Sequence, residues 1–341
     1  MTFPTRDKRW RLKAAALAAV GTLLVPACGG GTQEAGTAES SGEAESSYPE
    51  RPITWMVSFD PGGGSDTQAR RVQQQLEEDL GTSIQIEYRS GGGGAVGWAE
   101  AAQASADGYT VSGLVIPHIL IQPLALEDTG YETEDFRAAA WQVGAPVALL
   151  VSEDSQFEDL EGFLQHAEDN PGELTIGGVG NYSASDLALA QLMQSSDVDV
   201  SYVPVTGGAG ALISDLAGGH IDAAMLGTSH AATSDKVRPL AIGSEDRIDA
   251  FPDVPTFTEL GHEVNISYAW GVGMPADAPD EAVTRFGEAV ITAMEDPEIQ
   301  EELPDQGFDP IMIGPDEAQS YVDEQKEVYA DLLPLLEEMS G

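Results

Sequence analysis

The sequence predicts an α/β fold with more than one hydrophobic core. Short apolar runs rich in β-branched and aromatic residues alternate with amphipathic helical segments, which is the pattern of parallel sheets whose strands are joined by helices. The 294 residues from Tyr48 to Gly341 are more than one core usually covers, so two domains are expected. Hydrophobic residues make up 42% of the chain, enough to form sizeable cores.

The first predicted unit is a strand, a glycine loop and a helix. Residues 53–57 form a short apolar run that ends before Pro61 and three glycines. Ser65 is expected to cap the helix that follows, with Gln68 three residues later. The helix is predicted to end at Gly81, and its buried stripe comprises Ala69, Val72, Leu76 and Leu80.

The same unit recurs along the chain. Residues 84–88 alternate as a strand does, glycines follow at 91–94, and a helical pattern covers 97–105. Residues 109–116 and 145–151 indicate two further buried strands.

The alternation continues beyond Val151. A helix is expected near residues 157–168, followed by a strand at 174–176 that runs into glycine. Ser183 is expected to cap the next helix, with Asp186 three residues later. Further strands are indicated at residues 200–204, 221–226, 237–242 and 268–272, and a further helix through residues 212–216.

The C-terminal part is predicted to be helical. One apolar stripe runs over residues 282–293, and a last acidic helix begins at Pro315. Pro334 should interrupt that helix, because proline lacks the backbone N–H and clashes with the preceding turn.

Four strand-to-helix junctions are rich in glycine. Glycine permits a tight turn and exposes backbone N–H groups at the start of a helix, where unsatisfied donors and the helix dipole favour an anion. In open α/β sheets ligands bind beyond the carboxyl ends of strands, which is where such junctions lie. One such loop is ordinary in a tight βα unit, but four in one chain indicate a binding site. They are residues 61–66, 89–94, 177–185 and 205–210.

Neutral side chains near these junctions add candidate hydrogen-bond donors, namely Ser65, Asn181, Tyr182, Ser183, Ser185 and Thr206. Arg89 is a candidate countercharge for an anion, or alternatively half of a structural salt bridge in so acidic a protein. His118, after Pro117, and His230, after Ser229, are candidates for the wall of a cleft, with a place on the surface or in the core as the alternative.

The charge balance and the single cysteine exclude several classes of protein. The chain has 15 Lys and Arg against 58 Asp and Glu, a formal net charge of −43, so nucleic acid is not expected as a partner. One cysteine excludes a disulfide framework and multi-cysteine metal sites within one chain. The sequence contains no P-loop, zinc-protease or nucleophile-elbow motif, so no enzyme, cofactor or metal site is predicted.

The N-terminus predicts export and lipid attachment. Five basic residues precede an apolar stretch of 12 residues at 14–25, which is too short to span a bilayer as a helix, so residues 1–27 are predicted to be a signal peptide. The segment before Cys28 resembles the lipobox of bacterial lipoproteins, which makes Cys28 the predicted anchor to the membrane. Residues 28–47, rich in Gly, Ser, Thr, Ala and Glu, are predicted to be a flexible tether.

The mature chain would carry 10 basic and 57 acidic residues, a formal net charge of −47. At about 1 M salt the Debye length is only about 3 Å, so carboxylates on a surface stop repelling one another. A chain of this composition therefore suits a halophilic host, a hypothesis that predicts lower stability in dilute buffer.

Several segments are similar, in order and spacing, to the Bug or tripartite tricarboxylate transporter substrate-binding receptors. They are residues 48–53 (YPERPI), 59–66 (FDPGGGSD), 89–94 (RSGGGG), 106–110 (ADGYT), 170–174 (NPGEL), 178–183 (GVGNYS), 202–204 (YVP) and 251–256 (FPDVPT). The resemblance covers nearly all of residues 48–341, so it is far more specific than any single motif.

The resemblance implies a bilobed, periplasmic-binding-protein-like (Venus flytrap) fold, in which two α/β domains enclose a ligand cleft. Domain 1 would comprise residues 48–144 and 269–341, and domain 2 residues 145–268. In the family a ligand carboxylate sits at the first glycine loop, which corresponds here to Gly62, Gly63, Gly64, Ser65 and Asp66. The second domain would contribute the loop from Gly180 to Ser185. Many members have a lysine where this chain has Thr206, which offers a hydroxyl and no charge.

The predicted function is that of a non-catalytic lipoprotein receptor on the outer face of the cell membrane. It would be a monomer that binds a small organic carboxylate of the di- or tricarboxylate class for uptake by a two-subunit membrane permease. Two alternatives stay open: a sensor that passes the ligand signal to a membrane kinase, and an exported hydrolase that uses Ser183 or Ser185 with a histidine.

Overall fold

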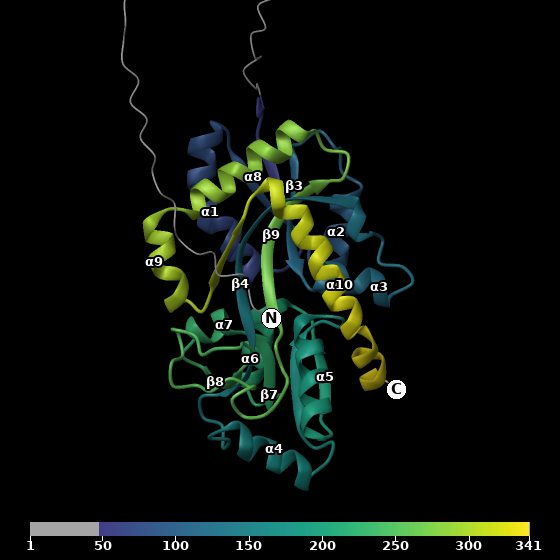
Figure 1. Ribbon diagram of the computed structural model, residues 1–341, viewed down its shortest axis with the longest axis vertical. Coiled ribbons are helices and arrows are strands. Elements are labelled where there is room, and N and C mark those ends of the chain that lie inside the picture. Colours follow the sequence, from purple (N-terminus) through teal and green to yellow (C-terminus); the bar gives the residue numbers. More distant parts are fainter. Residues whose placement is uncertain (1–47, 341) are drawn as a thin grey trace, which may run out of the picture. The chain divides into compact units, whose positions relative to one another are not determined.

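The computed structural model describes residues 48–340, in which ten strands form one curled sheet (Figure 1). Its main path runs in the order β2-β1-β3-β9-β4-β7-β5-β6, and β8 and β10 pair with β4 beside that path. The strands are β1 (Ile53–Val57), β2 (Ile84–Tyr88), β3 (Thr110–Ile116), β4 (Phe136–Ser152), β5 (Thr175–Val179), β6 (Ser201–Val205), β7 (Ala223–Gly227), β8 (Val237–Ile242), β9 (Ser267–Pro275) and β10 (Asp309–Ile313).

Strand β4 joins two halves of this sheet. Up to Pro146 it pairs antiparallel with β9 and β10, and β9 pairs in turn with β3, which continues through β1 to β2. From Val147 onward β4 pairs antiparallel with β7 and β8, and β7 continues through β5 to β6. We call these the first and the second half-sheet. The parallel pairs β1–β2, β1–β3, β5–β6 and β5–β7 agree with the predicted βα units.

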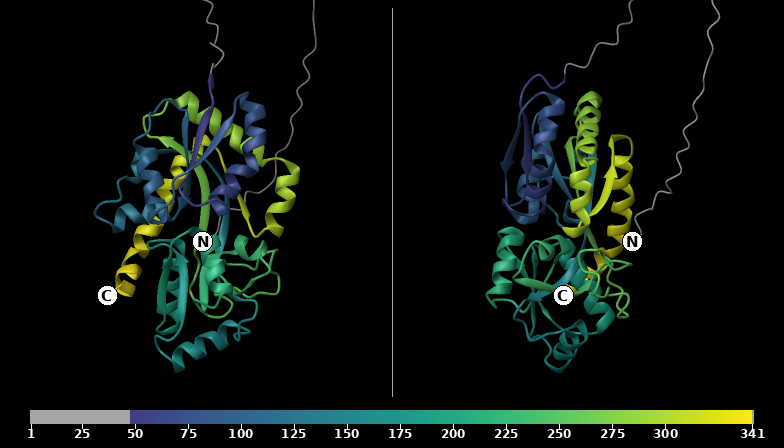
Figure 2. Two further views of the ribbon diagram at one scale, coloured as in Figure 1. Left: turned by 180° about the vertical axis from the view of Figure 1, so that it is seen from behind. Right: turned by 90° about the vertical axis from the view of Figure 1, so that its left-hand side faces the viewer.

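Helices cover both half-sheets, as Figures 1 and 2 show from three directions. Helix α10 is the longest of those described and contacts α8 and α3 as well as α5. The helices are α1 (Gly64–Leu80), α2 (Ala95–Ala102), α3 (His118–Ala125), α4 (Leu160–Asp169), α5 (Ala184–Ser196), α6 (Gly208–Ala217), α7 (Thr228–Ala232), α8 (Asp280–Met294), α9 (Pro297–Asp305) and α10 (Pro315–Ser340), with short 3-10 turns at Gly92–Gly94 and Thr133–Asp135. None of the helices in residues 48–340 is both long and apolar enough to cross a membrane.

The core consists of two apolar clusters that meet at the second part of β4. Leu149 and Val151 belong to the larger cluster, which reaches the first half-sheet, whereas Ala148 and Leu150 belong to a smaller cluster beneath α6. Successive side chains of a strand point to opposite faces, so one strand supports both clusters. All four residues are fully buried.

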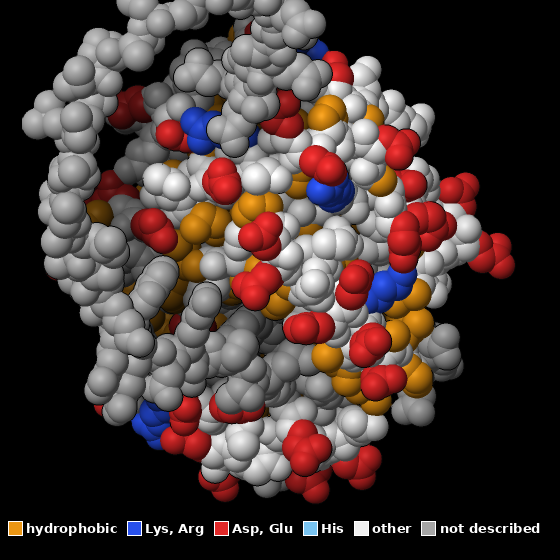
Figure 3. Space-filling view, turned by 45° about the horizontal axis from the view of Figure 1, so that its top comes forward, with side chains coloured by type: hydrophobic (Ala, Val, Ile, Leu, Met, Phe, Trp, Pro, Cys, Tyr) orange, Lys and Arg blue, Asp and Glu red, His pale blue; other side chains and the backbone are white. Residues whose placement is uncertain are grey.

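Acidic side chains are spread over the face of the molecule shown in Figure 3, with few Lys or Arg among them. The excess of carboxylates found in the composition is therefore visible as a distributed surface charge on this face.

Several predicted elements need correction. Helix α1 begins at Gly64 with Gly63 as its cap, so Ser65 lies inside the helix and does not cap it. Strand β5 extends to Val179, since Gly177, Gly178 and Val179 pair with β6. The two glycines are needed there for packing, because an added β-carbon would lie 2.5 Å from atoms of Leu212 or Tyr202. The cap predicted at Ser183 is confirmed by its side chain, which accepts the Asp186 N–H.

The interruption predicted at Pro334 is wrong, since α10 runs through it to Ser340. Leu336, beyond the proline, is 1% exposed and packs in the larger cluster, so tertiary burial holds the helix together there. The sequence reading also missed α3, α7, α9, β10 and residues 136–144 of β4. The predictions for residues 1–47, including Cys28, lie outside the described residues.

Candidate functional site

Two adjoining cavities lie between the half-sheets. The inner cavity measures about 70 Å³ and the outer about 350 Å³. Both are lined by Phe59, Asp60, Val179, Gly207 and Gly208, so they lie side by side, and we call the two together the cleft. Residues of the β1–α1 loop line it from the first half-sheet, and residues of the β6–α6 loop line it from the second.

The start of α1 faces the inner cavity. Gly63, Gly64 and Ser65 line that cavity, and the cap residue Gly63 has no side chain to bond the first-turn N–H groups. Amide donors at a helix start carry partial positive charge, so this end of α1 offers an anion neutral donors that no capping side chain occupies.

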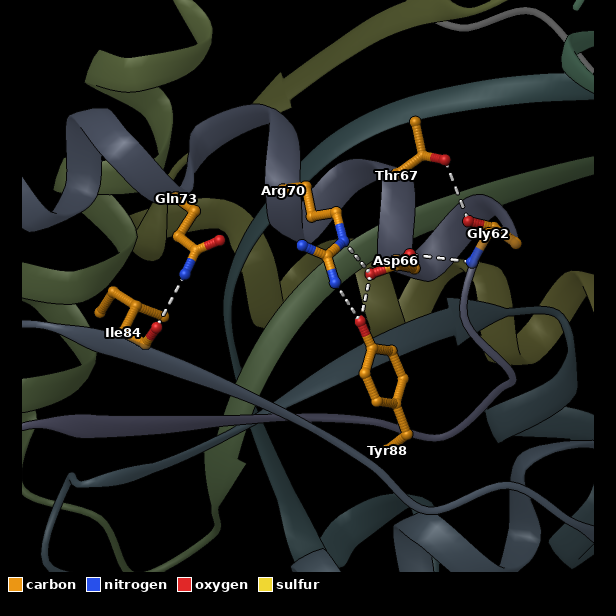
Figure 4. Close-up of polar contacts among 8 residues, drawn as sticks. Gly62, Asp66, Thr67, Arg70, Gln73, Ile84 and Tyr88 are labelled. Atoms are coloured by element: carbon orange, nitrogen blue, oxygen red, sulfur yellow. Dashed lines mark hydrogen bonds and ion pairs between the residues drawn. The ribbon is translucent and has the colours of Figure 1, made fainter.

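Asp66 fixes the loop that leads into α1. Its carboxylate accepts the Gly62 N–H at 2.8 Å, the Tyr88 hydroxyl at 2.7 Å and the Arg70 Nε–H at 2.8 Å (Figure 4). Arg70 also donates to the Tyr88 hydroxyl at 2.6 Å, which closes a ring of contacts between α1 and β2. Asp66 therefore occupies the Gly62 amide, and the Gly63 amide donates to the Asp60 carbonyl at 3.4 Å. Gly64 and Ser65, the first residues of α1, line the cavity beyond them.

The start of α6 faces the same cavity from the second half-sheet. Gly207, Gly208, Ala209 and Gly210 line the inner cavity, and the cap residue Gly207 again has no side-chain cap. A β-carbon placed on Gly208 would lie 4.0 Å from Cβ of Asp60, so this loop lies opposite the β1–α1 loop. Two uncapped helix starts thus converge on one cleft.

The start of α5 is different because it has a side-chain cap. Ser183 Oγ accepts the Asp186 N–H, and the Asp186 carboxylate accepts the Tyr182 N–H at 2.7 Å. Ser185 Oγ donates to the Met225 carbonyl at 2.6 Å. Burial raises the pKa of Asp186 to about 6, although the hydrogen bond from Tyr182 N–H opposes that shift.

Glycine loops of the two half-sheets touch at the outer cavity. A β-carbon added to Gly180 would lie 3.2 Å from Cα of Gly93. Gln122 Nε2 donates to the carbonyls of Gly92 and Gly93, at 3.3 and 3.1 Å, and so holds the first of these loops. A side chain on Gly180 would push against the Gly93 backbone, so the close approach of the loops depends on glycine at position 180.

Aromatic rings form the wall of the inner cavity. The imidazole of His118 stacks on Tyr268 at 5.6 Å between centroids, and Tyr268 stacks on Trp270 at 5.3 Å. The Tyr268 hydroxyl lies 3.0 Å from Ser185 Oγ, which positions the ring from the second half-sheet. Burial raises the pKa of Tyr268 to about 12, so this phenol is neutral.

The two histidines in the cavity wall are also neutral. Burial lowers the pKa of His118 to about 4; the Val179 backbone carbonyl opposes this without making a hydrogen bond of normal geometry. Burial likewise lowers the pKa of His230 to about 4. Among the described residues that line the cleft there is no Lys or Arg, and Asp60 is the one carboxylate.

The structure brings together some of the predicted site residues and not others. Gly63, Gly64 and Ser65 line the inner cavity, and Gly180, Asn181, Tyr182 and Thr206 line the outer one. Gly62, Asp66, Ser183 and Ser185 stand behind the lining, where they hold loops and strands through hydrogen bonds.

Arg89 forms ion pairs with Glu87 and Glu100 and donates to the Tyr88 carbonyl, and it lines neither cavity. These contacts agree with the alternative prediction, that Arg89 forms structural salt bridges. Within residues 48–340 no group of three or more His, Cys, Asp or Glu side chains is placed to hold a metal ion.

Sequence reasoning found the glycine loops and missed most of the wall. The loop at 207–210 was identified as an anion-binding junction, but its residues were not selected for the site. Tyr268 and Trp270 carry a usable signal, since alternate residues of a strand share one face, yet nothing local shows that this face reaches the β1–α1 loop. Phe59 lies two residues after β1 and begins the segment at 59–66 that carries the family resemblance, but it was not selected for the site.

The chain is similar in sequence to a family of known receptors. The family of tripartite tricarboxylate transporter receptors matches residues 68–335. A UPF0065 protein of Pseudomonas sp. (strain P51) is 30% identical over 284 residues, which cover 80% of this chain and 82% of that protein. Protein BugT of Bordetella pertussis is 26% identical over 295 residues, 84% of this chain and 89% of BugT.

Solved structures agree with the sequence relatives. The periplasmic binding protein BugD superposes with a TM-score of 0.78 at 25% identity, covering 85% of this chain and 98% of BugD. MatC from Rhodopseudomonas palustris, solved with bound malate, gives a TM-score of 0.78 at 26% identity, covering 84% of this chain and all of MatC. The predicted fold class, that of periplasmic solute-binding proteins, is confirmed. The chain belongs to the Bug, or tripartite tricarboxylate transporter, family of solute-binding receptors.

Proposed function

We propose that this protein is an extracytoplasmic, lipid-anchored receptor that binds a small organic carboxylate of the di- or tricarboxylate class and delivers it to a two-subunit permease. The observation that carries the proposal is the convergence of two helix starts without side-chain caps, those of α1 and α6, on one cleft. Two sets of backbone amides on opposite walls can hold an anion between them.

The net charge of the protein does not oppose this function. Backbone amides and hydroxyls are neutral, so their attraction for a carboxylate depends on local dipoles and on their distance from the anion. Asp66 is compensated by Arg70 and by two further donors, which limits its repulsion of a ligand at the start of α1. The malate bound to MatC is an example of a small carboxylate in a relative of this chain.

Lobe closure is the proposed mechanism. Strand β4 changes partners between Pro146 and Val147, close to the boundary proposed between domain 1 (residues 48–144 and 269–341) and domain 2 (residues 145–268). Rotation about the β4 and β9 crossings would separate the α1 and α6 helix starts, and a bound carboxylate would favour the closed arrangement, because only there does it touch both.

Direct titration tests the ligand class. Calorimetry of the purified protein against a panel of di- and tricarboxylates should show a micromolar-or-tighter complex with at least one acid. The amides of the same acids provide the control, since they keep the size and one acceptor oxygen on each group and lack the charge. Absence of both heat and a thermal shift for every acid would contradict the proposal.

The anchor and the permease need separate tests. Replacement of Cys28 by Ser should move the protein from the membrane fraction to the soluble extracytoplasmic fraction, whereas an unchanged distribution would contradict lipid attachment. Deletion of the gene should abolish uptake of the acid identified by calorimetry. Normal uptake in the deletion strain would contradict delivery to a permease.

A further inference from the structure

His118 lines the inner cavity and is 1% exposed. Among the described residues, neither Nδ1 nor Nε2 makes a hydrogen bond of normal geometry, although the Val179 backbone carbonyl lies close enough to oppose the lowering of the ring's pKa. Buried polar atoms in proteins are nearly always paired with protein, water or ligand, so an unpaired pair in a cavity wall requires an explanation.

The ring is held in place by its neighbours. His118 is the first residue of α3; one face stacks on Tyr268, and the Phe59 ring meets it edge-on at 5.8 Å between centroids. Tyr268 is in turn positioned by Ser185, whose hydroxyl is bonded to Met225. The imidazole is therefore pre-organised, which reduces the entropy lost when it binds a partner.

The chemistry of the ring restricts what it can bind. Burial keeps the imidazole uncharged at neutral pH, so it cannot act as a countercharge to a carboxylate. An uncharged imidazole presents one N–H donor and one acceptor nitrogen. A hydroxyl or keto oxygen is a suitable partner, whereas a carboxylate is better served by the amides at the starts of α1 and α6.

We infer that His118 is a specificity-determining residue, which hydrogen-bonds a hydroxyl or keto oxygen of the carboxylate bound at the α1 and α6 helix starts. This inference rests on the proposed function and names the ligand class more narrowly: hydroxy- and oxo-acids in preference to their unsubstituted analogues. A site built to bond a substrate hydroxyl rejects the analogue that lacks it, because a buried polar group then stays unpaired.

Matched pairs of acids test the inference. Malate and succinate differ by one hydroxyl, and so do citrate and tricarballylate. Calorimetry should show that the wild-type protein binds the hydroxylated member of the pair it accepts at least about tenfold more tightly. The variant H118F keeps an aromatic ring for stacking and loses both nitrogens, so it should bind the two members within about twofold of each other.

Two further variants separate specificity from structure. H118Q retains a neutral donor and acceptor and should recover part of the preference. H220F replaces an exposed histidine outside the cleft and should leave the preference unchanged. Melting temperatures without ligand report on folding, and a purely structural role for His118 would weaken both acids of a pair by the same factor.

The outcomes distinguish this inference from the proposed function. Equal affinities of the wild type for both acids of each pair, or an unchanged preference in H118F, would overturn the inference and leave the carboxylate receptor intact. If the wild type binds none of the four acids nor any other member of the panel, the proposed function fails and the inference fails with it.

Discussion

Gly180 lies against Gly93 where the loops of the two half-sheets meet, so closely that a β-carbon on Gly180 would be 3.2 Å from the Gly93 Cα. One residue comes from the loop after β5 and the other from the loop after β2. The contact is a close approach of the two backbones across the cleft.

Replacement of Gly180 by Ala should weaken ligand binding. Gly180 has φ +77°, where a side chain is strained, and the added methyl would also push against Gly93. We expect affinity for the carboxylate to fall by about tenfold or more. The steric clash of the added methyl group with Gly93 would cost about 1–3 kcal/mol and so hold the cleft open. Gly219 has a similar φ of +68° and nothing within 4 Å, so G219A carries the strain alone. Equal affinity losses in both variants would contradict this account.

A side chain at Gly64 should also be harmful, because it would clash with Trp270 and not with the opposite loop. Its missing β-carbon would lie 2.6 Å from Cζ2 of Trp270, so the indole rests on the first turn of α1. G64A should displace Trp270 from the cavity wall, lower the free energy of unfolding by about 1–3 kcal/mol and weaken binding. G63A is the control. Gly63 lines the same cavity, but the nearest neighbour of an added β-carbon there would be the Asp60 carbonyl oxygen, at 3.4 Å. Urea unfolding and tryptophan fluorescence of both variants check this, and identical behaviour of the two would refute it.

Asp66 should matter more than the ion pair it forms. D66N removes an ionised acceptor shared by Gly62, Tyr88 and Arg70, and we expect a loss of about 1–3 kcal/mol in the free energy of unfolding, together with weaker binding. R70A removes the ion pair with Asp66 and the Arg70 hydrogen bond to Tyr88. The Arg70 side chain is 57% exposed, so the effect of R70A should be within about 1 kcal/mol. An R70A effect as large as that of D66N would show that Asp66 acts mainly through Arg70 and not through the loop that it holds.

Asp186 should make the protein less stable as pH rises through the acid range. Its pKa is raised from 3.8 to about 6 in the folded protein, so between these values the folded state binds more protons than the unfolded state. Stability from this group is therefore full below about pH 4 and is lost by about pH 6, at a cost of about 3 kcal/mol. D186N should remove that slope. Urea unfolding of both proteins at pH 4.5 and 7.5 measures the difference, and parallel pH profiles would contradict the burial argument.

Salt should stabilise the fold. The chain has 58 Asp and Glu against 15 Lys and Arg, and carboxylates are spread over the face in Figure 3. Screening at about 1 M KCl reduces their mutual repulsion, so the melting temperature should rise steeply from dilute buffer. Sucrose at matched osmolality is the control for solute exclusion. Full thermal stability without added salt would rule out the halophilic hypothesis.

Local sequence patterns were sufficient to predict the elements that are buried on one face and exposed on the other. Helix α1 has one buried stripe and β2 alternates, so both were predicted from periodicity. Residues 136–144 of β4 are buried on both faces and rich in alanine, and α3 is apolar on most sides with Pro123 inside it, so neither shows a period. Their structure depends on neighbours far away in the sequence.

The residues of the candidate site also fall into those that a local pattern predicts and those that depend on distant parts of the sequence. Glycines mark the loops because they punctuate strands and helices locally, which is why Gly63 and Gly180 were selected. Trp270 reaches Gly64 across more than 200 residues of sequence, and only the pairing of β9 with β3 brings them together. Ser183 and Ser185 were selected as ligand donors, yet their hydroxyls bond groups of the protein itself, namely the Asp186 amide, the Met225 carbonyl and the Tyr268 hydroxyl, which the sequence does not reveal.

The central claim is that backbone amides at the starts of α1 and α6 hold the carboxylate. Amide chemical shifts measured by NMR during titration with the acid that binds in calorimetry test it most directly. We predict that the largest shifts fall on Gly64, Ser65, Gly208 and Ala209, and that they saturate together. Saturable binding that leaves those four amides unmoved while others shift would contradict the account.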